Sequence, residues 1–153
     1  MSERAAIDGI LKANRYLVLA TADLAVRPWA TPVFFARLGA DSICWVSSPQ
    51  SRHSRTIAEH PSIAACVFDS TVEVGRAEAA YFDADARLAA PHEVGPAIGA
   101  LNDRLPEGKR LTVDDLMPKG PMAVYVAQLR RSYILVRGGD PEHGNVLDMT
   151  LEV

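Results

Sequence analysis

The stretch from Arg27 to Pro61 constrains the fold of this chain more than any other part of its sequence. Two apolar runs of strand length, residues 28–37 and 42–47, flank the tight turn LGAD. Strands joined by a turn this short must lie side by side and run in opposite directions. The stretch therefore predicts an antiparallel hairpin, whose apolar face has to pack against the rest of the chain.

A short helix of about residues 52–60 is expected directly after this hairpin. Ser51 is a good N-cap for it, and Pro61 ends it. The strand before the turn carries Pro28 and Pro32, which cannot donate hydrogen bonds to a neighbouring strand. The early part of that strand is therefore expected at a sheet edge, or facing a ligand instead of another strand.

Strand-like runs continue on both sides of the hairpin. Further runs rich in β-branched and aromatic residues predict strands at 15–21, 62–68, 72–82, 122–129, 132–136 and 146–153. Most of these runs follow one another without a long helical crossover, which favours antiparallel pairing over βαβ units. We predict a single domain over residues 1–153, mainly β, with a small β-barrel of six or seven strands decorated by small helices.

Helical spacing of apolar residues predicts two further helices. The first covers residues 3–13, with Ser2 as the candidate N-cap. The second lies in the segment 83–120, where apolar residues repeat at intervals of four, three and four at Val94, Ile98, Leu101 and Leu105. Thr112 and Asp115 have the spacing of a weak capping box for a one-turn helix.

Composition excludes several classes of partner. A net charge of −3 gives no bulk attraction to nucleic acid or to an anionic membrane. No apolar run approaches the roughly 20 residues that span a bilayer. The first residues, MSERAAIDG, contain no apolar signal core. We therefore expect a cytoplasmic protein with neither a nucleic-acid nor a membrane partner.

Motifs for metal binding or hydrolysis are also missing. Cys44 and Cys66 lie in apolar runs without CxxC spacing, so reduced core thiols are favoured over a disulfide or a metal pair. The four histidines share no metal-ligand spacing, and no metal site is predicted. Asp83 and Asp85 are interpreted as turn and surface residues. No GxSxG, HExxH, Walker or GxGxxG pattern occurs, and the sequence identifies no catalytic acid or base.

The loop before the short helix is the strongest candidate site. Hydroxyl and basic side chains crowd into nine positions there: Ser47, Ser48, Ser51, Arg52, His53 and Arg55. A phosphate needs several donors that converge from one side and positive charge to offset its own, and the start of a helix adds free N–H groups. The sequence thus indicates a phosphate-bearing cofactor. The alternative is a solvated helix start with ordinary capping and surface arginines.

The segment WATPVFF, at positions 29–35, is the second candidate. A flat aromatic ligand can lie against the backbone of an extended strand that carries small residues. Ala30, Thr31 and Pro32 would allow that approach, and Trp29 could wall one side. The alternative is plain strand packing, with Trp29 as a core or interface aromatic.

The order of these features resembles one known family. A strand, a TP-containing strand, the SSPQSRH loop, a helix that ends in HP and the VEVGRAE segment together resemble the pyridoxamine 5'-phosphate oxidase-like flavin-binding proteins. The resemblance covers about residues 10–82 well and continues more loosely to AVYVAQLRRSYIL. It implies a six-stranded antiparallel split β-barrel that forms a homodimer, with flavin mononucleotide (FMN) in a groove between the protomers.

The resemblance also implies roles for particular residues. Residues 29–32 match the strand that lies along the flavin ring. Val46 and Ser47 match contacts to the ring and ribityl chain, and Ser51, Arg52 and His53 match the phosphate-binding Ser-Arg-Lys, with Arg55 one turn further on.

Three departures separate the chain from the true oxidases. His53 replaces the usual lysine, and a neutral imidazole supplies less charge. Phe35 stands where those enzymes carry a phosphate-binding lysine, and their C-terminal tryptophan and arginine signature is not recognisable in residues 129–153. We therefore expect an FMN-dependent oxidoreductase that does not oxidise pyridoxamine phosphate.

Two other functions stay open at this point. One is a reductase that uses a deazaflavin, which needs a longer basic groove; Arg55, Arg130 and Arg131 could supply it. The other is a non-catalytic carrier or sensor that binds flavin or haem. For the oxidoreductase, the expected partners are a small-molecule substrate or a nicotinamide electron donor, beside a second copy of the chain.

Overall fold

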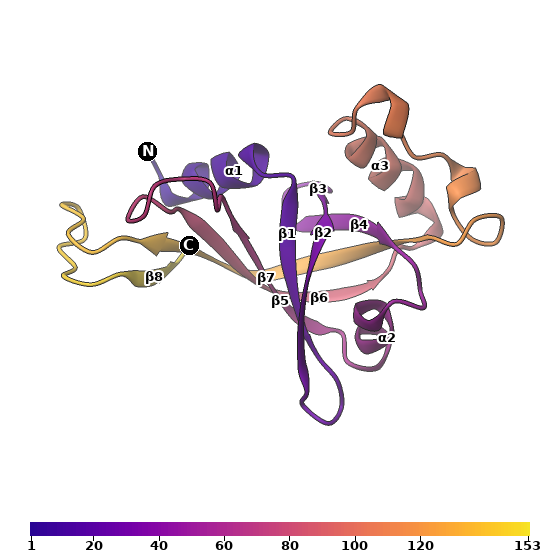
Figure 1. Cartoon of the computed structure of the whole chain (residues 1–153), viewed down its shortest axis with the longest axis horizontal. Helices are drawn as coiled ribbons and strands as arrows, with labels where there is room; N and C mark the ends of the chain where they lie inside the picture. The colour runs from indigo at the N-terminus through magenta and orange to yellow at the C-terminus, as the bar shows by residue number, and fades with distance from the viewer.

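One curled antiparallel sheet with three short α-helices makes up the computed structural model, which describes residues 1–153 (Figure 1). The strands are β1 (Tyr16–Ala22), β2 (Pro28–Phe34), β3 (Ala36–Arg37), β4 (Ser42–Ser47), β5 (Ser62–Phe68), β6 (Ala79–Leu88), β7 (Ala123–Val136) and β8 (Met149–Glu152). The helices are α1 (Glu3–Ala13), α2 (Arg52–Glu59) and α3 (Pro91–Asn102), with 3-10 turns η1 (Glu107–Lys109) and η2 (Val113–Asp115).

The order of the strands explains why the sheet curls. The order is β2-β1-β5-β6-β7-β4-β3, and β8 pairs with β7. The strands at the two ends of this order, β2 and β3, are separated in the chain by Phe35 alone. The two edges must therefore meet at Phe35, whose side chain is fully buried. This arrangement is the predicted mainly β split barrel.

Alternation along β4 shows how the sheet divides two cores. Ile43 and Trp45 point into the barrel, and the Trp45 ring stacks on Tyr125 at 5.9 Å. Cys44 and Val46 point the other way, toward α3. Successive side chains of a strand face opposite sides, so one apolar run supplies both cores.

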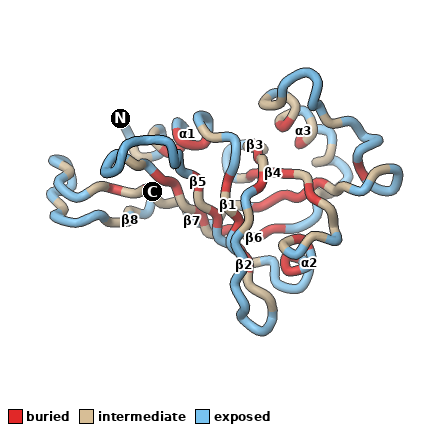
Figure 2. The backbone as a smooth tube through the Cα atoms, in the orientation of Figure 1, coloured by how far each residue is buried: buried red, intermediate tan, exposed pale blue.

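The barrel interior holds the larger core, and α1 closes one side of it (Figure 2). Ile7, Ile10 and Leu11 are the buried face of α1, as the helical spacing predicted. The predicted cap is confirmed, because the Ser2 Oγ accepts a hydrogen bond from the Ala5 N–H. Burying large aliphatic side chains stabilises the fold by about 1.5 to 3 kcal/mol each.

The smaller core lies outside the barrel, where α3 packs on β3 and β4 through Ala97 and Leu101. The Glu93 carboxylate ties down the start of this helix. It accepts hydrogen bonds from the Arg87 guanidinium and the Ala90 N–H, which lower the pKa of Glu93 to about 2. The predicted helix face reaches Leu105, but α3 ends at Asn102.

Arg104 explains why the chain leaves the helix there. Its guanidinium donates to the carbonyls of Phe35, Leu11 and Asn14, and so connects three elements that are distant in sequence. These bonds hold the end of α3 against the end of α1 and the junction between β2 and β3. A tertiary interaction thus overrides the local helical pattern.

Several strand boundaries differ from the sequence prediction. The strand expected at 72–82 begins only at Ala79 and runs to Leu88, because Gly75 lies in a turn with a φ of 89°. Asp83 and Asp85 therefore lie within β6, and their interpretation as turn residues was wrong. The side chain of Asp83 accepts a hydrogen bond from the Tyr133 hydroxyl.

Two other runs were divided incorrectly. The single run 28–37 is two strands, β2 and β3, because the chain turns inward at Phe35. The two strands predicted at 122–129 and 132–136 form one strand, β7, which crosses Arg130 and Arg131 with a register shift opposite Asp83 and Ala84. The sheet has eight strands, whereas six or seven were predicted.

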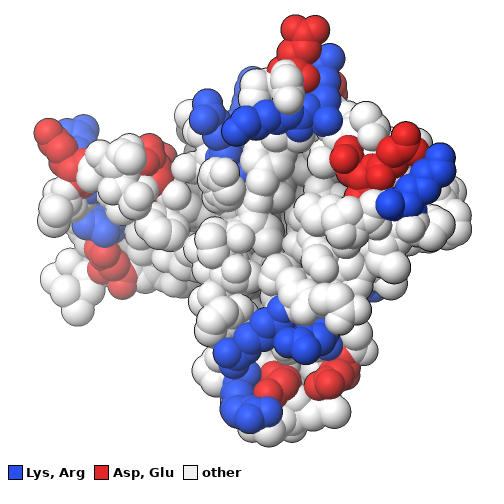
Figure 3. Space-filling view, turned by 45° about the vertical axis from the view of Figure 1, so that its right-hand side comes forward, with Lys and Arg blue, Asp and Glu red and all other residues white.

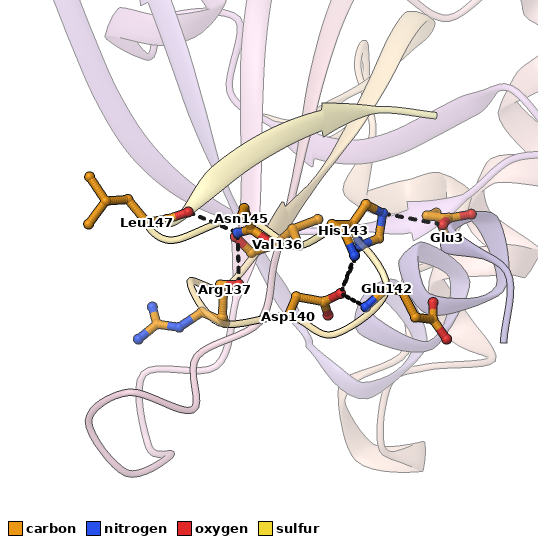
Figure 4. Close-up of polar contacts among 8 residues, drawn as sticks. All are labelled: Glu3, Val136, Arg137, Asp140, Glu142, His143, Asn145 and Leu147. Atoms are coloured by element: carbon orange, nitrogen blue, oxygen red, sulfur yellow. Dashed lines mark hydrogen bonds and ion pairs between the residues drawn. The ribbon is translucent and has the colours of Figure 1, made fainter.

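The β7–β8 hairpin projects from the barrel near both termini (Figure 1). In its turn, the His143 imidazole lies 2.9 Å from the Asp140 carboxylate and 3.8 Å from that of Glu3 at the start of α1 (Figure 4). The hydrogen bond that the His143 ring donates to Asp140 and the negative charge around the ring raise the pKa of His143. Asn145 donates to three backbone carbonyls and so shapes the same turn.

Both cysteines are free thiols. Cys44 is buried and Cys66 is half-buried, and neither forms a disulfide. Burial raises the pKa of Cys44 to about 11, so this thiol stays protonated. No helix is long and apolar enough to cross a membrane. No three His, Cys, Asp or Glu side chains are placed to hold a metal ion.

Candidate anion site at the start of α2

The end of β4 and the start of α2 bring the predicted serines together. Ser51 is the N-cap of α2, as predicted: its Oγ accepts from the Ser54 N–H at 3.3 Å. The same oxygen contacts the Ser54 hydroxyl at 2.7 Å. Ser47, the last residue of β4, is buried beside them. The hydroxyls are thus fixed in place by the two elements and by each other.

His53 connects this cluster to β4. Its Nε2 lies 2.8 Å from the Ser47 Oγ and 3.3 Å from the Ser51 Oγ. Burial lowers the pKa of His53, so the imidazole is neutral at neutral pH. The lysine position of the family motif is therefore occupied here by a directional, uncharged group.

Arg52 supplies the positive charge next to this cluster. Its guanidinium lies 4.1 Å above the centre of the Trp29 ring, in cation–π geometry. Trp29 stands near the start of β2, which is an edge strand, and 41% of its surface is exposed. The predicted ring wall and the predicted phosphate ligand therefore meet in space, although 23 positions separate them in the numbering.

The backbone adds further donors at the same place. The N–H of Arg55 makes the first turn's bond to the Ser51 carbonyl, so the N–H groups of Arg52 and His53 have no partner within the helix. Free N–H groups at a helix start attract anions, because the helix dipole places partial positive charge there. Hydroxyls, free N–H groups and one guanidinium together can hold a phosphate ester.

Three of the predicted residues lie apart from this cluster. Arg55 lines a cavity of about 550 Å³ beneath α2 with Arg87 and Tyr125. Val46 packs toward α3, away from the barrel interior that holds Trp45. Arg130, a candidate for a longer basic groove, is paired with Asp85 at 3.3 Å.

The small residues of β2 lie along an exposed edge of the sheet. Ala30 and Pro32 are exposed and Thr31 is half-buried, while β2 pairs on one side only, with β1. The predicted edge position is confirmed. Ser54 is the one member of the cluster that the sequence reasoning missed, although it lies among the same nine positions as the predicted serines.

The chain belongs to the pyridoxamine 5'-phosphate oxidase family. A family model described as pyridoxamine 5'-phosphate oxidase matches residues 4–102, which is more than half of the chain. This region includes α1, the β1–β6 part of the sheet, the Ser51 loop and α3. No curated protein is similar enough in sequence to count as a relative.

Solved structures support the same fold. A haem-binding protein from Mycobacterium smegmatis superposes with a TM-score of 0.72 at 16% identity, over 100% of this chain and 58% of its own. HutZ, the haem storage protein of Vibrio cholerae, gives 0.70 at 19% identity, over 85% of this chain and 92% of its own. An F420 reductase gives 0.61 at 20% identity, over 82% and 94%.

These likenesses establish the split-barrel architecture and nothing finer. The chain spans little more than half the length of the M. smegmatis protein. At such identities, proteins that share a barrel can hold different cofactors, because function resides in the site instead of the fold. The residues around Ser51, and not the shared fold, decide which cofactor this chain can bind.

Proposed function

We propose that this protein is an FMN-binding oxidoreductase whose cofactor phosphate binds at the start of α2. The observation that carries the proposal is the convergence of the Ser47 and Ser51 hydroxyls on the His53 imidazole, at a helix start beside Arg52. Membership of the pyridoxamine 5'-phosphate oxidase family supports it independently.

Each residue has a distinct part in this proposal. When the phosphate binds, the Ser51 hydroxyl turns its proton from Ser54 to a phosphate oxygen, and the Ser47 hydroxyl and the free N–H groups of α2 donate beside it. Arg52 offsets the phosphate charge, and Trp29 limits where the rest of the cofactor can lie. Bound FMN would supply the exchange of hydride or single electrons. The chain's own residues hold the cofactor and shield one side of it.

The edge strand β2 supports a second part of the proposal, that two copies of the chain enclose the cofactor. Its residues are mostly exposed, and Pro28 and Pro32 offer no N–H to a further strand. An exposed apolar edge of this kind is normally covered. A second protomer would cover the edge and the Trp29 ring together, while leaving the backbone beside Ala30 and Thr31 accessible to a flat ring.

The experiment that tests this proposal begins with the purified protein. Its absorption spectrum and the mass of any co-purifying molecule identify FMN, a deazaflavin or haem directly. FMN added to the apo protein should bind with one flavin per protomer, and light scattering should report a dimer. A co-purifying deazaflavin or haem, or a failure of FMN to bind, would overturn the assignment.

Turnover separates an enzyme from a carrier. We propose that a nicotinamide serves as the electron donor and a small molecule as the substrate. Anaerobic mixing of the FMN-loaded protein with NADH or NADPH should bleach the flavin absorption. A flavin that stays oxidised with both nucleotides would instead favour a carrier or a sensor, the other function that the sequence leaves open.

A further inference from the structure

A cavity lies away from the start of α2, between α1 and α3. It has a volume of about 760 Å³. Leu11, Ala36 and Ala100 form its apolar floor. A second cavity of about 470 Å³ shares Arg15, Asp103 and Arg104 with it, so the two cavities adjoin, and we call them together the groove.

The walls of this groove carry excess positive charge. Its basic residues are Lys12, Arg15, Arg37, Arg104 and Lys109, and its acidic residues are Asp8 and Asp103. Asp8 is already paired with Arg37. Lys12, Arg15 and Lys109 have no carboxylate within ion-pair distance. Figure 3 shows Lys and Arg side chains gathered in a band near the top of the molecule.

This concentration is notable because the chain as a whole is negative, with a net charge of −3. Like charges that face a common cavity repel one another, and an anion in the cavity relieves that repulsion. The charge of the groove therefore favours a ligand with more than one negative group.

Arg104 holds the walls of the groove together and offsets the partial negative charge at the C-terminal end of α1. It donates to the carbonyls of Leu11 and Asn14, at the C-terminal end of α1, and to that of Phe35. A helix C-terminus carries partial negative charge that would repel an anion. Because these carbonyls already accept from Arg104, the end of α1 presents little of that charge to the groove.

The second cavity adds an aromatic surface. Tyr16 and Phe34 line it and meet edge to face, with ring centres 6.2 Å apart. Tyr16 is 60% exposed. A flat apolar group can therefore lie on these rings while its charged ends reach Lys12 and Lys109 at the two ends of the groove.

We propose that this groove binds an elongated organic anion with at least two carboxylate or phosphate groups and a flat apolar portion. Lys12 and Arg15 hold one charged group and Lys109 holds another. The Tyr16 and Phe34 rings contact the apolar portion. The cations of the site come from the end of α1, the residue before β1 and η1, which take no part in the cluster around Ser51.

The position of the groove relative to β2 suits a substrate-binding site. It lies at the Phe34 end of β2, whereas Trp29 and Arg52 lie at the other end, and a strand of seven residues spans about 20 Å. The groove therefore suits the substrate of a cofactor that lies along β2. This assignment as the substrate site rests on the proposed function, but the binding of an anion does not.

The binding test uses the apo protein and two probes. Trimellitate is a flat tricarboxylate, and inorganic pyrophosphate is a compact phosphate anion. Each is titrated by calorimetry and by NMR, where saturable shifts are expected at the amides of Ala13, Ala36 and Ala100. Tighter binding of trimellitate assigns carboxylates to the natural ligand, and tighter binding of pyrophosphate assigns phosphates; either result supports the site.

Two double variants with the same change in net charge complete the test. Lys12→Ala/Arg15→Ala should weaken binding by about tenfold or more, since two charge-assisted contacts are lost. Lys119→Ala/Arg137→Ala, which removes two cations outside the groove, should change binding by less than about twofold, because distant exposed charges are screened. Thermal unfolding of both variants checks that they fold.

Three results would overturn the inference: no saturable binding of either probe, an equal loss in both double variants, or displacement of a bound probe by FMN in direct competition. The last result would assign the groove to the flavin itself. A failure of FMN to bind, with intact probe binding, would refute the proposed function alone.

Discussion

The start of α2 and the groove between α1 and α3 both suit an anion, but different forces create them. Around Ser51, neutral donors meet at hydrogen-bond distances, and a single guanidinium lies beside them. In the groove, Lys12, Arg15 and Lys109 contribute charge with no fixed partner. The first arrangement selects a ligand by the direction of its hydrogen bonds, and the second by its charge.

Burial accounts for this difference. Ser47 and Ser54 are buried, and a buried hydroxyl is stable only when a partner satisfies it, so the cluster is held in one geometry. Lys12 and Arg15 are exposed, where water and salt screen their charge. We therefore expect affinity at the Ser51 cluster to depend on single atoms, and affinity in the groove to depend on the number of cations.

The largest effect is expected from Arg104, which organises the groove. Arg104→Met keeps most of the apolar stem but leaves three backbone carbonyls without their donor. Charge-assisted hydrogen bonds contribute enough that unfolding free energy should fall by about 3 kcal/mol. Urea unfolding measures it, with Arg110→Met as the control. A loss below about 1 kcal/mol would show that α1 and α3 do not depend on this residue.

The next effect separates two arginines of the same helix. Arg52→Ala should weaken FMN binding by about 1.5 to 3 kcal/mol, the contribution of a charge-assisted bond. Arg55→Ala should change it by less than about 0.5 kcal/mol, because Arg55 lines the cavity beneath α2 with Arg87 and Tyr125, on the side of Ser54 away from Ser47 and His53. Fluorescence titration of the flavin measures both. Equal losses of FMN affinity in the two variants would place Arg55 in the phosphate site and contradict the proposal that Arg52 alone supplies its charge.

A smaller effect compares the N-caps of two helices. Ser51→Ala should lower the unfolding free energy of the apo protein by about 1 kcal/mol, since the Ser54 N–H and hydroxyl lose their partner. Ser2→Ala removes an exposed cap and should cost about half as much. Chemical unfolding of the two variants decides the order, and a larger loss for Ser2→Ala would contradict the rigid cluster.

The smallest effect is a pH dependence at His143, a third place where charge collects. Its pKa is raised by the Asp140 hydrogen bond and by the charges of Asp140, Glu3 and Glu142. The folded protein thus holds this proton more tightly than the unfolded chain, whose histidine pKa is about 6.5. The resulting stability is complete below that pH and is lost as the pH rises through the higher folded pKa.

We therefore expect the His143→Gln variant to have a lower free energy of unfolding than the wild type near pH 6 and a similar one near pH 8. The difference shrinks because the folded wild type loses its proton over this range. Unfolding curves across this range measure the difference, and the Asp140 carboxylate stays ionised throughout, because its own pKa is lowered. Glu3→Gln removes the more distant partner and should show a weaker form of the same trend. Parallel stability curves for wild type and His143→Gln would show that the contact is not an ion pair.

Local patterns predicted the helices better than the strand boundaries. Ser2 and Ser51 cap α1 and α2 as expected, because capping depends on neighbouring residues alone. The strand placed at 72–82 was displaced to 79–88, since apolar residues such as Val74 are exposed in the loop before it. A run of β-branched residues does not show where its pairing partner begins.

The candidate site was predicted in part, because some of its contacts join residues that are close in sequence. Ser47, Ser51 and His53 are close in sequence, and their contacts follow from one strand end and one helix start. The contact of Arg52 with Trp29 could be anticipated only through the family resemblance, because it needs the curvature of the whole sheet. The groove beside Lys12 and Arg15 was not anticipated, since its walls come from three separate segments.

Local patterns along the chain were enough to predict the mainly β class, the short capped helices and the donor-rich loop, because periodicity, capping and turn chemistry act over a few residues. The closure of the sheet by β2 and β3 at Phe35, and the connection of α3 to α1 through Arg104, could be seen only in the folded chain. Those contacts join residues far apart in the chain, whose approach is favourable only once the core between them is buried.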